Sequence, residues 1–320
     1  MENLVFSLNA TLPIFALMVL GNVFKRIGLI DEKAAAWMNK FVFKVALPVL
    51  VFEDLADQDF AGTWNGNFVA FCFLATSVSI ALIYLLSKVV IKDNGRRGEF
   101  IQGAYRSSAA LLGIAFIRNI YGTEASGMGP LMILGSVPLY NIFAVIILTL
   151  TAENDENEGT DKKALAKSTI KGIITNPIII GIALGLVFSL IDIPRPKVVG
   201  TIITDIAALA TPLGLMSMGA TFEASKAVKD IKPALLAAFI KLFALVAIFL
   251  PIAVRMGFSG EQIVAILVML GSATTVSCFI MAKSMGHEGT LSSSIIMITT
   301  FGCSFSLAFW LFVLRSFGVI

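Results

Sequence analysis

Residues 106–122 read RSSAALLGIAFIRNIYG, and residues 271–286 read GSATTVSCFIMAKSMG. Both stretches open with small and hydroxyl-bearing side chains, where a good membrane helix would carry Leu, Ile and Phe. They align at a fixed spacing of 164 residues, which pairs Ser108 with Ser272. The chain therefore contains two similar, weakly apolar segments that each begin with small and polar residues.

The composition is typical of an integral membrane protein. Of the 320 residues, 57% are hydrophobic and 14% are charged, whereas soluble domains carry about 25% charged residues. The mean hydropathy is +0.90. A chain of this length accommodates about ten spans of about 20 residues each, with short connections. The net charge of +3 is too small to indicate nucleic acid as a partner, and lipid is the expected surrounding.

Ten apolar stretches predict an all-α integral membrane fold with ten transmembrane helices. Charged residues, Gly and Pro separate them, and they cover about 4–24, 34–52, 67–90, 100–119, 128–150, 172–191, 197–219, 233–254, 262–282 and 290–314. The fourth and ninth stretches are the least apolar, and they contain the two quoted segments.

The loops predict an orientation in the cytoplasmic membrane. Fifteen Lys and Arg residues fall on alternate loops of one side, and five fall on the other side. Because positively charged loops stay in the cytoplasm, we expect both termini outside. The polar linker 153–171 is then cytoplasmic, and it separates five spans from five.

The 164-residue spacing extends over most of the chain. Pro13 falls on Pro177 without any gap, and glycines and further prolines coincide at the same shift. We therefore predict two five-helix repeats, over residues 1–152 and 172–320. Because each repeat has an odd number of spans, the second must enter the membrane from the opposite side. Inverted repeats with a midplane site at broken helices are typical of secondary transporters.

The repeats predict the residues of a substrate site at a broken fourth and a broken ninth helix. The expected substrate-binding residues are Ser107, Ser108, Ala109, Gly113, Tyr140, Asn141, Ser272, Ala273, Thr274 and Thr275. Small residues also let helices pack closely, and Ser and Thr can bond to their own helix. That structural interpretation stays open for each segment.

Four charged residues inside predicted spans are candidates for a functional role or an ion pair, because a charge at the bilayer centre costs about 2.5–3.5 kcal/mol. Lys44 and Asp205 are candidates for an ion pair between the second and seventh spans or for a coupling role. Arg106 and Lys241 are candidate counter-charges for an anionic substrate. The sequence shows no intramembrane acidic cluster for a cationic substrate.

The second span carries a recognisable motif. It consists of Asn39, Lys40, Phe41, Val42, Pro48, Leu50 and Phe52. Gly113 and Ile114 precede Tyr121 and Gly122 in the fourth segment, and Ala282 and Lys283 precede Gly286 in the ninth. On these residues the chain resembles the auxin efflux carrier family over essentially its whole length.

The resemblance implies a fold related to bile acid/sodium symporters. Spans 1, 2, 6 and 7 would form a scaffold, and spans 3–5 and 8–10 a transport unit in which spans 4 and 9 cross. Dimers would form through the scaffold. The bacterial members of the family imply a small organic acid such as malate or malonate as substrate. The family often has Asn and Pro where this chain has Ser107 and Ser108, and Pro where it has Ala115 and Ala273. Milder breaks are expected as a result.

These observations favour a secondary active transporter of a small organic acid anion, working by alternating access, over an enzyme. A channel or a transport-like sensor of the same fold is the alternative. An intramembrane enzyme would need a second membrane Asp or a membrane His, and the single histidine, His287, falls in a predicted loop. No cofactor and no metal site are expected, and the choice between H+ and Na+ as the coupling ion stays open.

Overall fold

The computed structural model of the chain is all-helical. It describes residues 2–56, 64–109, 113–121, 127–152, 170–172, 174–191 and 195–320. The predicted cytoplasmic linker 153–171 lies almost wholly outside the described residues.

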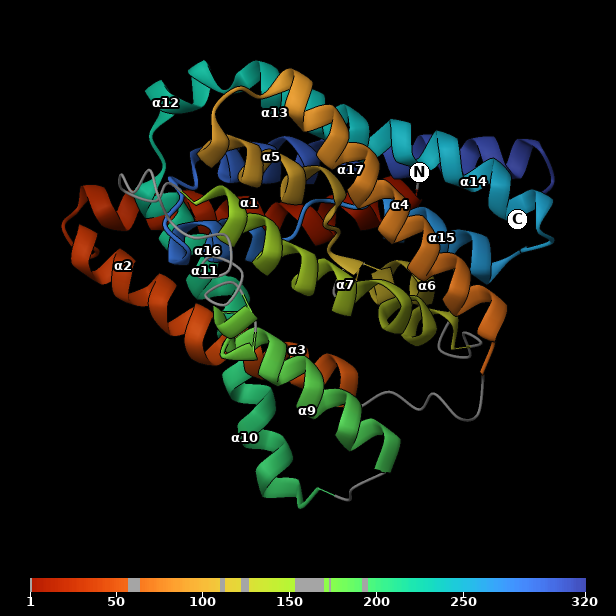
Figure 1. The fold of residues 1–320 in the computed structure, drawn as a ribbon, viewed down its shortest axis with the longest axis horizontal. Coiled ribbons are helices and arrows are strands. Elements are labelled where there is room, and N and C mark those ends of the chain that lie inside the picture. The colour runs from red at the N-terminus through yellow and green to blue at the C-terminus, as the bar shows by residue number, and fades with distance from the viewer. Residues whose placement is uncertain are drawn as a thin grey trace.

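The helices follow the apolar stretches of the sequence (Figure 1). The first half contains α1 (Glu2–Arg26), α2 (Glu32–Phe41), the π-helical turn η1 (Val42–Ala46), α3 (Leu47–Ala56), α4 (Gly66–Val90), α5 (Asn94–Tyr105), α6 (Ile114–Tyr121) and α7 (Met128–Thr151). The second half contains α9 (Pro177–Ile191), α10 (Lys197–Ala208), α11 (Ala210–Thr221), α12 (Ala224–Lys229), α13 (Ile231–Phe239), the π-helical turn η3 (Ile240–Ala244), α14 (Leu245–Arg255), α15 (Glu261–Gly271), α16 (Ser277–Ser284) and α17 (Thr290–Ser316).

Six helical segments among the described residues are long and apolar enough to cross a membrane. They are Glu32–Ala56, Gly66–Val90, Met128–Thr151, Lys197–Thr221, Ile231–Arg255 and Thr290–Ser316. The helices α9 and α15 are apolar but shorter. Helices bond their backbone groups internally, which is the condition for crossing a hydrocarbon layer.

Polar side chains fix where several helices begin. Asp31, Asn65 and Asp93 each accept a hydrogen bond from the backbone N–H three residues further on, at 2.6, 3.1 and 3.1 Å. These caps satisfy donors that the first turn of a helix leaves free. The caps start α2, α4 and α5 in the short polar connections between apolar runs.

One group of helices consists of α1, α2, α3, α9, α10 and α11. Within it α3 packs against α9 and α1 packs against α11. Figure 1 shows α3, α9 and α10 projecting together from the rest of the molecule. Glycines permit close approaches here, since a Cβ atom on Gly181 would overlap the backbone of Pro48, and one on Gly219 would overlap the backbone of Met18. Small residues at helix crossings are the usual means of close packing in membranes.

A second group consists of α4, α5, α7, α13, α14, α15 and α17. Here α7 packs against α4 and α5, α13 against α17, and α14 against α15. The helix α7 is the most enclosed of the six long segments. Contacts between α1 and α17 join the two groups, and the residues discussed next lie where the groups meet.

Candidate functional site

Two helices of the second group stop inside the protein. The helix α5 ends at Tyr105 and α15 ends at Gly271, while α6 begins at Ile114 and α16 at Ser277. Residues 106–108 and 272–276 are not α-helical. Both interruptions fall on the small and hydroxyl-bearing residues that the sequence singles out.

The two interrupted segments touch one another. Ser107 and Thr274 form an isolated antiparallel bridge. The backbone N–H of Ser108 donates to the Ala273 carbonyl at 2.9 Å, and Thr274 Oγ1 donates to the Gly103 carbonyl at 2.8 Å. Backbone that leaves the helix at membrane depth must find partners within the protein, and each break supplies partners for the other.

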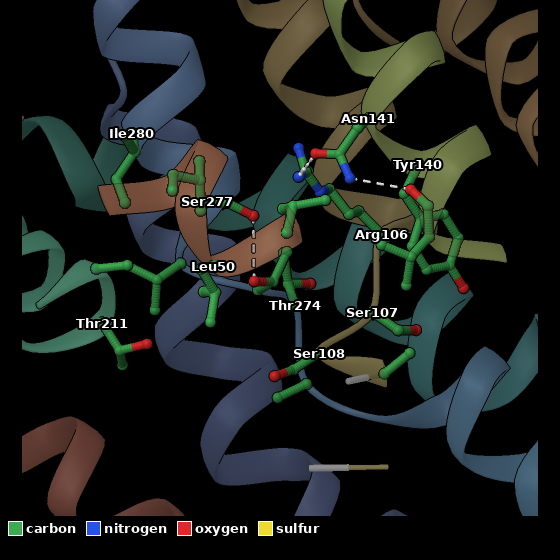
Figure 2. Close-up of a pocket in the computed structure, with 18 of the residues that line it drawn as sticks. Leu50, Arg106, Ser107, Ser108, Tyr140, Asn141, Thr211, Thr274, Ser277 and Ile280 are labelled. Atoms are coloured by element: carbon green, nitrogen blue, oxygen red, sulfur yellow. Dashed lines mark hydrogen bonds between the residues drawn. The ribbon is translucent and has the colours of Figure 1, made fainter. Parts of the chain in front are cut away.

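A cavity of about 180 Å³ opens beside this crossing. The crossing contributes residues 106–109 and 273–277 to its lining, and α7 contributes Val137, Tyr140 and Asn141. The first helix group contributes Ile14, Leu47, Leu50, Val51, Asp54, Ala210 and Thr211. Figure 2 shows Leu50 and Thr211 on one side of the view, with Arg106, Tyr140 and Asn141 on the other.

Arg106 provides positive charge in this cavity. It directly follows the last residue of α5, and its side chain is only 3% exposed. Its guanidinium donates from Nη2 to Asn141 Oδ1 and from Nη1 to Met281 Sδ. Asn141 is itself fixed, because its Nδ2 donates to the Val137 carbonyl at 2.9 Å. Within the described residues, the recorded salt bridges do not include Arg106.

Tyr140 links α7 to the end of α15. Its hydroxyl donates to the Met269 carbonyl at 3.0 Å, and its own carbonyl accepts from the Tyr105 hydroxyl at 3.1 Å. Ser107 Oγ donates to the same Met269 carbonyl. The tyrosine therefore lines the cavity and also fixes the geometry of the break.

The structure separates the predicted site residues into three sets. The cavity lining includes Arg106, Ser107, Ser108, Ala109, Tyr140, Asn141, Ala273, Thr274 and Thr275. Gly113, Ser272 and Lys241 are buried outside that lining. Lys44 and Asp205 are exposed on the outer surface of the chain.

Lys44 and Asp205 do not form a recorded ion pair within the described part of one chain. The turn η1, which carries Lys44, does contact α10, which carries Asp205. The two spans are neighbours, as an ion pair would require, but both charged side chains face outward. Neither residue lines the cavity.

The cavity also contains residues that the sequence did not indicate. Asp54, near the end of α3, lines the cavity. Thr211 and Ser277 add hydroxyl groups, and Ser277 Oγ lies 3.2 Å from Thr275 Oγ1. The available signal for Asp54 is an acidic side chain directly after an apolar run, which is common at helix ends and therefore weak.

His287 and the cysteines lie elsewhere. The two ring nitrogens of His287 lie 3.0 Å from the carbonyl oxygens of Gly95 and Leu148. The three cysteines are buried free thiols. Among the described residues, no group of three or more His, Cys, Asp or Glu side chains is arranged to hold a metal ion.

Comparison with known proteins shows the family of this chain. Residues 6–311, nearly the whole chain, match the family described as "Membrane transport protein". The chain belongs to this family. The resemblance to auxin efflux carriers, inferred from the motifs above, is confirmed at the level of the family. The protein is a multi-pass membrane transporter and not an enzyme.

Two relatives match over almost their full length. One, named "Uncharacterized transporter", is from Methanothermobacter thermautotrophicus and is 22% identical over 309 residues, covering 96% of this chain and 98% of its own. The other, named "Putative malonate transporter", is from Rhizobium meliloti and is 25% identical over 317 residues, covering 95% of each chain. Both are named as transporters, and only the second is named for a substrate.

Proposed function

We propose that this protein is a secondary active transporter, which moves a small organic acid anion across the cytoplasmic membrane by alternating access. The observation that carries the proposal is Arg106. Its guanidinium is buried at a helix break, lines a cavity, and is held in place by Asn141. A buried cation without a carboxylate among its recorded partners suits an anionic ligand.

The chemistry of the cavity fits a carboxylate. Guanidinium groups bind carboxylates with two parallel charge-assisted hydrogen bonds. The cavity is also lined by Val276, the N-cap of α16, and by Ser277, the first residue of that helix. The positive end of that helix adds to the attraction for an anion. Hydroxyl groups on Ser108 and Thr275 can then hydrogen-bond the remaining oxygen atoms.

The size of the cavity favours a small metabolite. Its volume of about 180 Å³ is below the 300–1,000 Å³ that is common for drug-sized ligands. A three- or four-carbon dicarboxylate such as malonate or malate suits this space. The name of the Rhizobium meliloti relative supports malonate, at 25% identity.

We propose an architecture of ten spans in two inverted five-helix repeats, over residues 1–152 and 172–320. Helix bounds support it, since a shift of 164 residues carries Gly66–Val90 almost onto Ile231–Arg255 and Met128–Thr151 into Thr290–Ser316. The antiparallel bridge at the crossing supports the inversion. Six spans are long helices, and α1, α9 and the interrupted pairs α5–α6 and α15–α16 supply the other four.

The position of the cavity between two helix groups supports alternating access. The group of α1–α3 and α9–α11 would be the scaffold, and the group of α4–α7 and α13–α17 the transport unit. Scaffold residues such as Leu50 and transport-unit residues such as Arg106 line opposite walls of the cavity. A rocking motion between the groups would therefore open the cavity to one side and close it to the other.

The distribution of Lys and Arg supports termini outside the cell and a cytoplasmic linker. Both ends of the chain lie toward the same end of the long helices in Figure 1. That placement requires an even number of crossings, which ten spans supply.

Asp54 supports proton coupling. An ionised carboxylate repels an anionic substrate in the same small cavity, whereas a protonated one does not. Binding of the substrate and binding of a proton at Asp54 would then favour each other, and the two would move together as a symport.

We also propose that the transporter is a homodimer through its scaffold. Lys44 lies in the middle of the span Glu32–Ala56, and both Lys44 and Asp205 are exposed. Exposure of either charge to lipid is costly. A symmetric dimer would bring Lys44 of each copy toward Asp205 of the partner, because every contact in such an interface occurs twice.

Uptake by purified protein in liposomes tests the proposed function. A panel of labelled mono- and dicarboxylates is offered with an imposed proton gradient, a sodium gradient or no gradient. Saturable uptake with a preference for malonate or malate, and exchange of labelled for unlabelled acid without a gradient, is expected of a carrier. Unsaturable currents would indicate a channel, and binding of the acid without uptake would indicate a sensor.

A further inference from the structure

Lys241 is the most completely buried charged side chain among the described residues. It lies in the π-helical turn η3, in the middle of the span Ile231–Arg255, and its side chain is 0% exposed. The sequence suggested a counter-charge for the substrate, but Lys241 is not part of the cavity lining. Its ammonium group contacts instead the C-terminal ends of α5 and α15, where the two helices are interrupted.

The ammonium group has three oxygen partners, all at the crossing. Nζ donates to the Tyr105 carbonyl at 3.0 Å, to the Leu270 carbonyl at 3.0 Å, and to Ser107 Oγ. Tyr105 is the last residue of α5, and Leu270 lies in the last turn of α15. Carbonyls at the end of a helix have no partner within the helix, and they carry the negative end of its dipole.

Two negative helix ends therefore meet at one buried point. The Met269 carbonyl, next to Leu270, is satisfied by the hydroxyls of Ser107 and Tyr140. The recorded ion pairs of the described residues include no carboxylate partner for Lys241. The charge of Lys241 and the two helix ends consequently balance one another without any acidic side chain.

This arrangement is also that of a site for a small monovalent cation. Interrupted helices in transporters commonly present unwound carbonyls and helix C-termini to Na+. Main-chain carbonyls and a hydroxyl are oxygen ligands of the kind that hard cations prefer. Here a covalently attached ammonium occupies the point at which such oxygens converge.

We propose that the ammonium of Lys241 is a built-in substitute for a bound sodium ion, which holds the ends of α5 and α15 together and frees transport from any need for Na+. The proposal concerns the ion dependence of the proposed transport function. It also has a consequence for the protein alone, because removal of the side chain would leave three oxygens that a free Na+ can occupy.

Thermal unfolding of purified protein in detergent tests this consequence without any transported substrate. Wild type, Lys241→Ala and Lys241→Met are compared in NaCl, KCl and choline chloride at equal ionic strength. The alanine variant leaves room for an ion, whereas methionine fills the space with an apolar chain. The readout is the Tm as a function of cation concentration.

Wild type is expected to have the same Tm in all three salts. Lys241→Ala should have a lower Tm that NaCl alone raises saturably, by about 4 °C once Na+ exceeds its Kd about 100-fold. Lys241→Met should have a low Tm in every salt. If Lys241→Ala cannot be purified even in NaCl, Lys241→Ser, which adds a hydroxyl oxygen, should show the same sodium response.

The proposal is overturned by a wild-type Tm or uptake that depends on Na+, or by an alanine variant that responds equally to the three salts. Failure of both the alanine and serine variants to fold in NaCl would also overturn it, because the vacated oxygens would then not bind sodium. A wild type that transports no carboxylate would refute the proposed function but would leave the unfolding result intact.

Discussion

At the scale of single residues, Asp54 and Arg106 give the cavity its electrostatic character. Both line the same space of about 180 Å³, one on α3 and the other just after α5. The guanidinium attracts a bound anion, whereas the ionised carboxylate repels it. Protonation of Asp54 removes this repulsion, which is the physical basis for linked binding of anion and proton.

Replacement of Asp54 by Asn is expected to uncouple transport from the proton gradient. Asparagine is neutral at every pH, so substrate binding no longer takes up a proton. With an inward proton gradient, the rate of uptake should fall to the rate measured without a gradient. Exchange of labelled for unlabelled acid should persist. Gradient-driven uptake that survives in Asp54→Asn would place the coupling proton elsewhere.

Glu99 shows a structural use of a buried carboxylate. Its two oxygens accept from the backbone N–H groups of Gly289 and Ser292, at 2.8 and 2.7 Å, and so cap the beginning of α17. Charge-assisted caps at the positive end of a helix are stronger than neutral ones. The contact joins α5 to α17.

Glu99→Gln is expected to lower the free energy of unfolding by about 2 kcal/mol, since the charge and one acceptor are lost in a buried site. Thermal or denaturant unfolding in detergent measures the change. Glu32→Gln is the control, because Glu32 is exposed and only a loose ion pair with Lys25, at 4.0 Å, is lost. Equal effects of the two substitutions would refute the capping role.

At the scale of helices, close packing through glycine holds the proposed scaffold together. A Cβ atom on Gly181 in α9 would overlap the backbone of Pro48 in α3. Any side chain there must separate the two helices, because a backbone cannot move aside as a flexible side chain can.

Gly181→Ala is therefore expected to destabilise the protein by about 1–3 kcal/mol and to lower uptake. Gly200→Ala in α10 is a matched control, since a Cβ atom at Gly200 meets nothing within 4 Å and alanine favours the helix. The Tm of both variants measures the difference. A fall of the same size in Gly200→Ala would indicate that packing against Pro48 is not the cause.

The sequence predicted the helical breaks more successfully than the directions of individual side chains. The breaks were predictable because Ser107, Ser108 and Thr274 are poor choices for continuous apolar helices, and because the same pattern occurs twice. Lys241 was placed on the correct span but assigned to the substrate. It lies in a π-helical turn, and an extra residue in a turn changes the direction of every side chain relative to a regular helix.

Asp54 was not predicted as a site residue for a different reason. The sequence shows that an acidic residue follows an apolar run, but it does not show which helix end approaches the crossing. That depends on how α3 packs across α9 and α10, which is a property of the tertiary structure. Arg106, by contrast, was predictable as a candidate because it adjoins the break in the sequence itself.

At the scale of the whole molecule, the exposed charged residues Lys44 and Asp205 allow the proposed homodimer interface to be tested. Replacement of each residue by Cys, in protein without its three native cysteines, allows cross-linking with a short bis-maleimide. Copies carrying Lys44→Cys mixed with copies carrying Asp205→Cys should give cross-linked dimers in membranes. A pair of cysteines at Val89 and Phe312, which are exposed on α4 and α17 of the proposed transport unit, serves as the control. Monomers only, or equal cross-linking in the control, would contradict the proposed interface.

The central claim is that a buried arginine at the crossing of two interrupted helices binds the transported carboxylate. Uptake of labelled malonate into proteoliposomes tests it most directly, with wild type compared to Arg106→Gln, Arg106→Lys and Arg315→Gln. Loss of a buried charge pair costs about 2–5 kcal/mol, so Arg106→Gln should raise KM about 100-fold or abolish uptake. Lysine should restore part of the activity, and Arg315→Gln, at an exposed arginine, should behave as wild type. Unchanged malonate uptake by a folded Arg106→Gln variant would contradict the account.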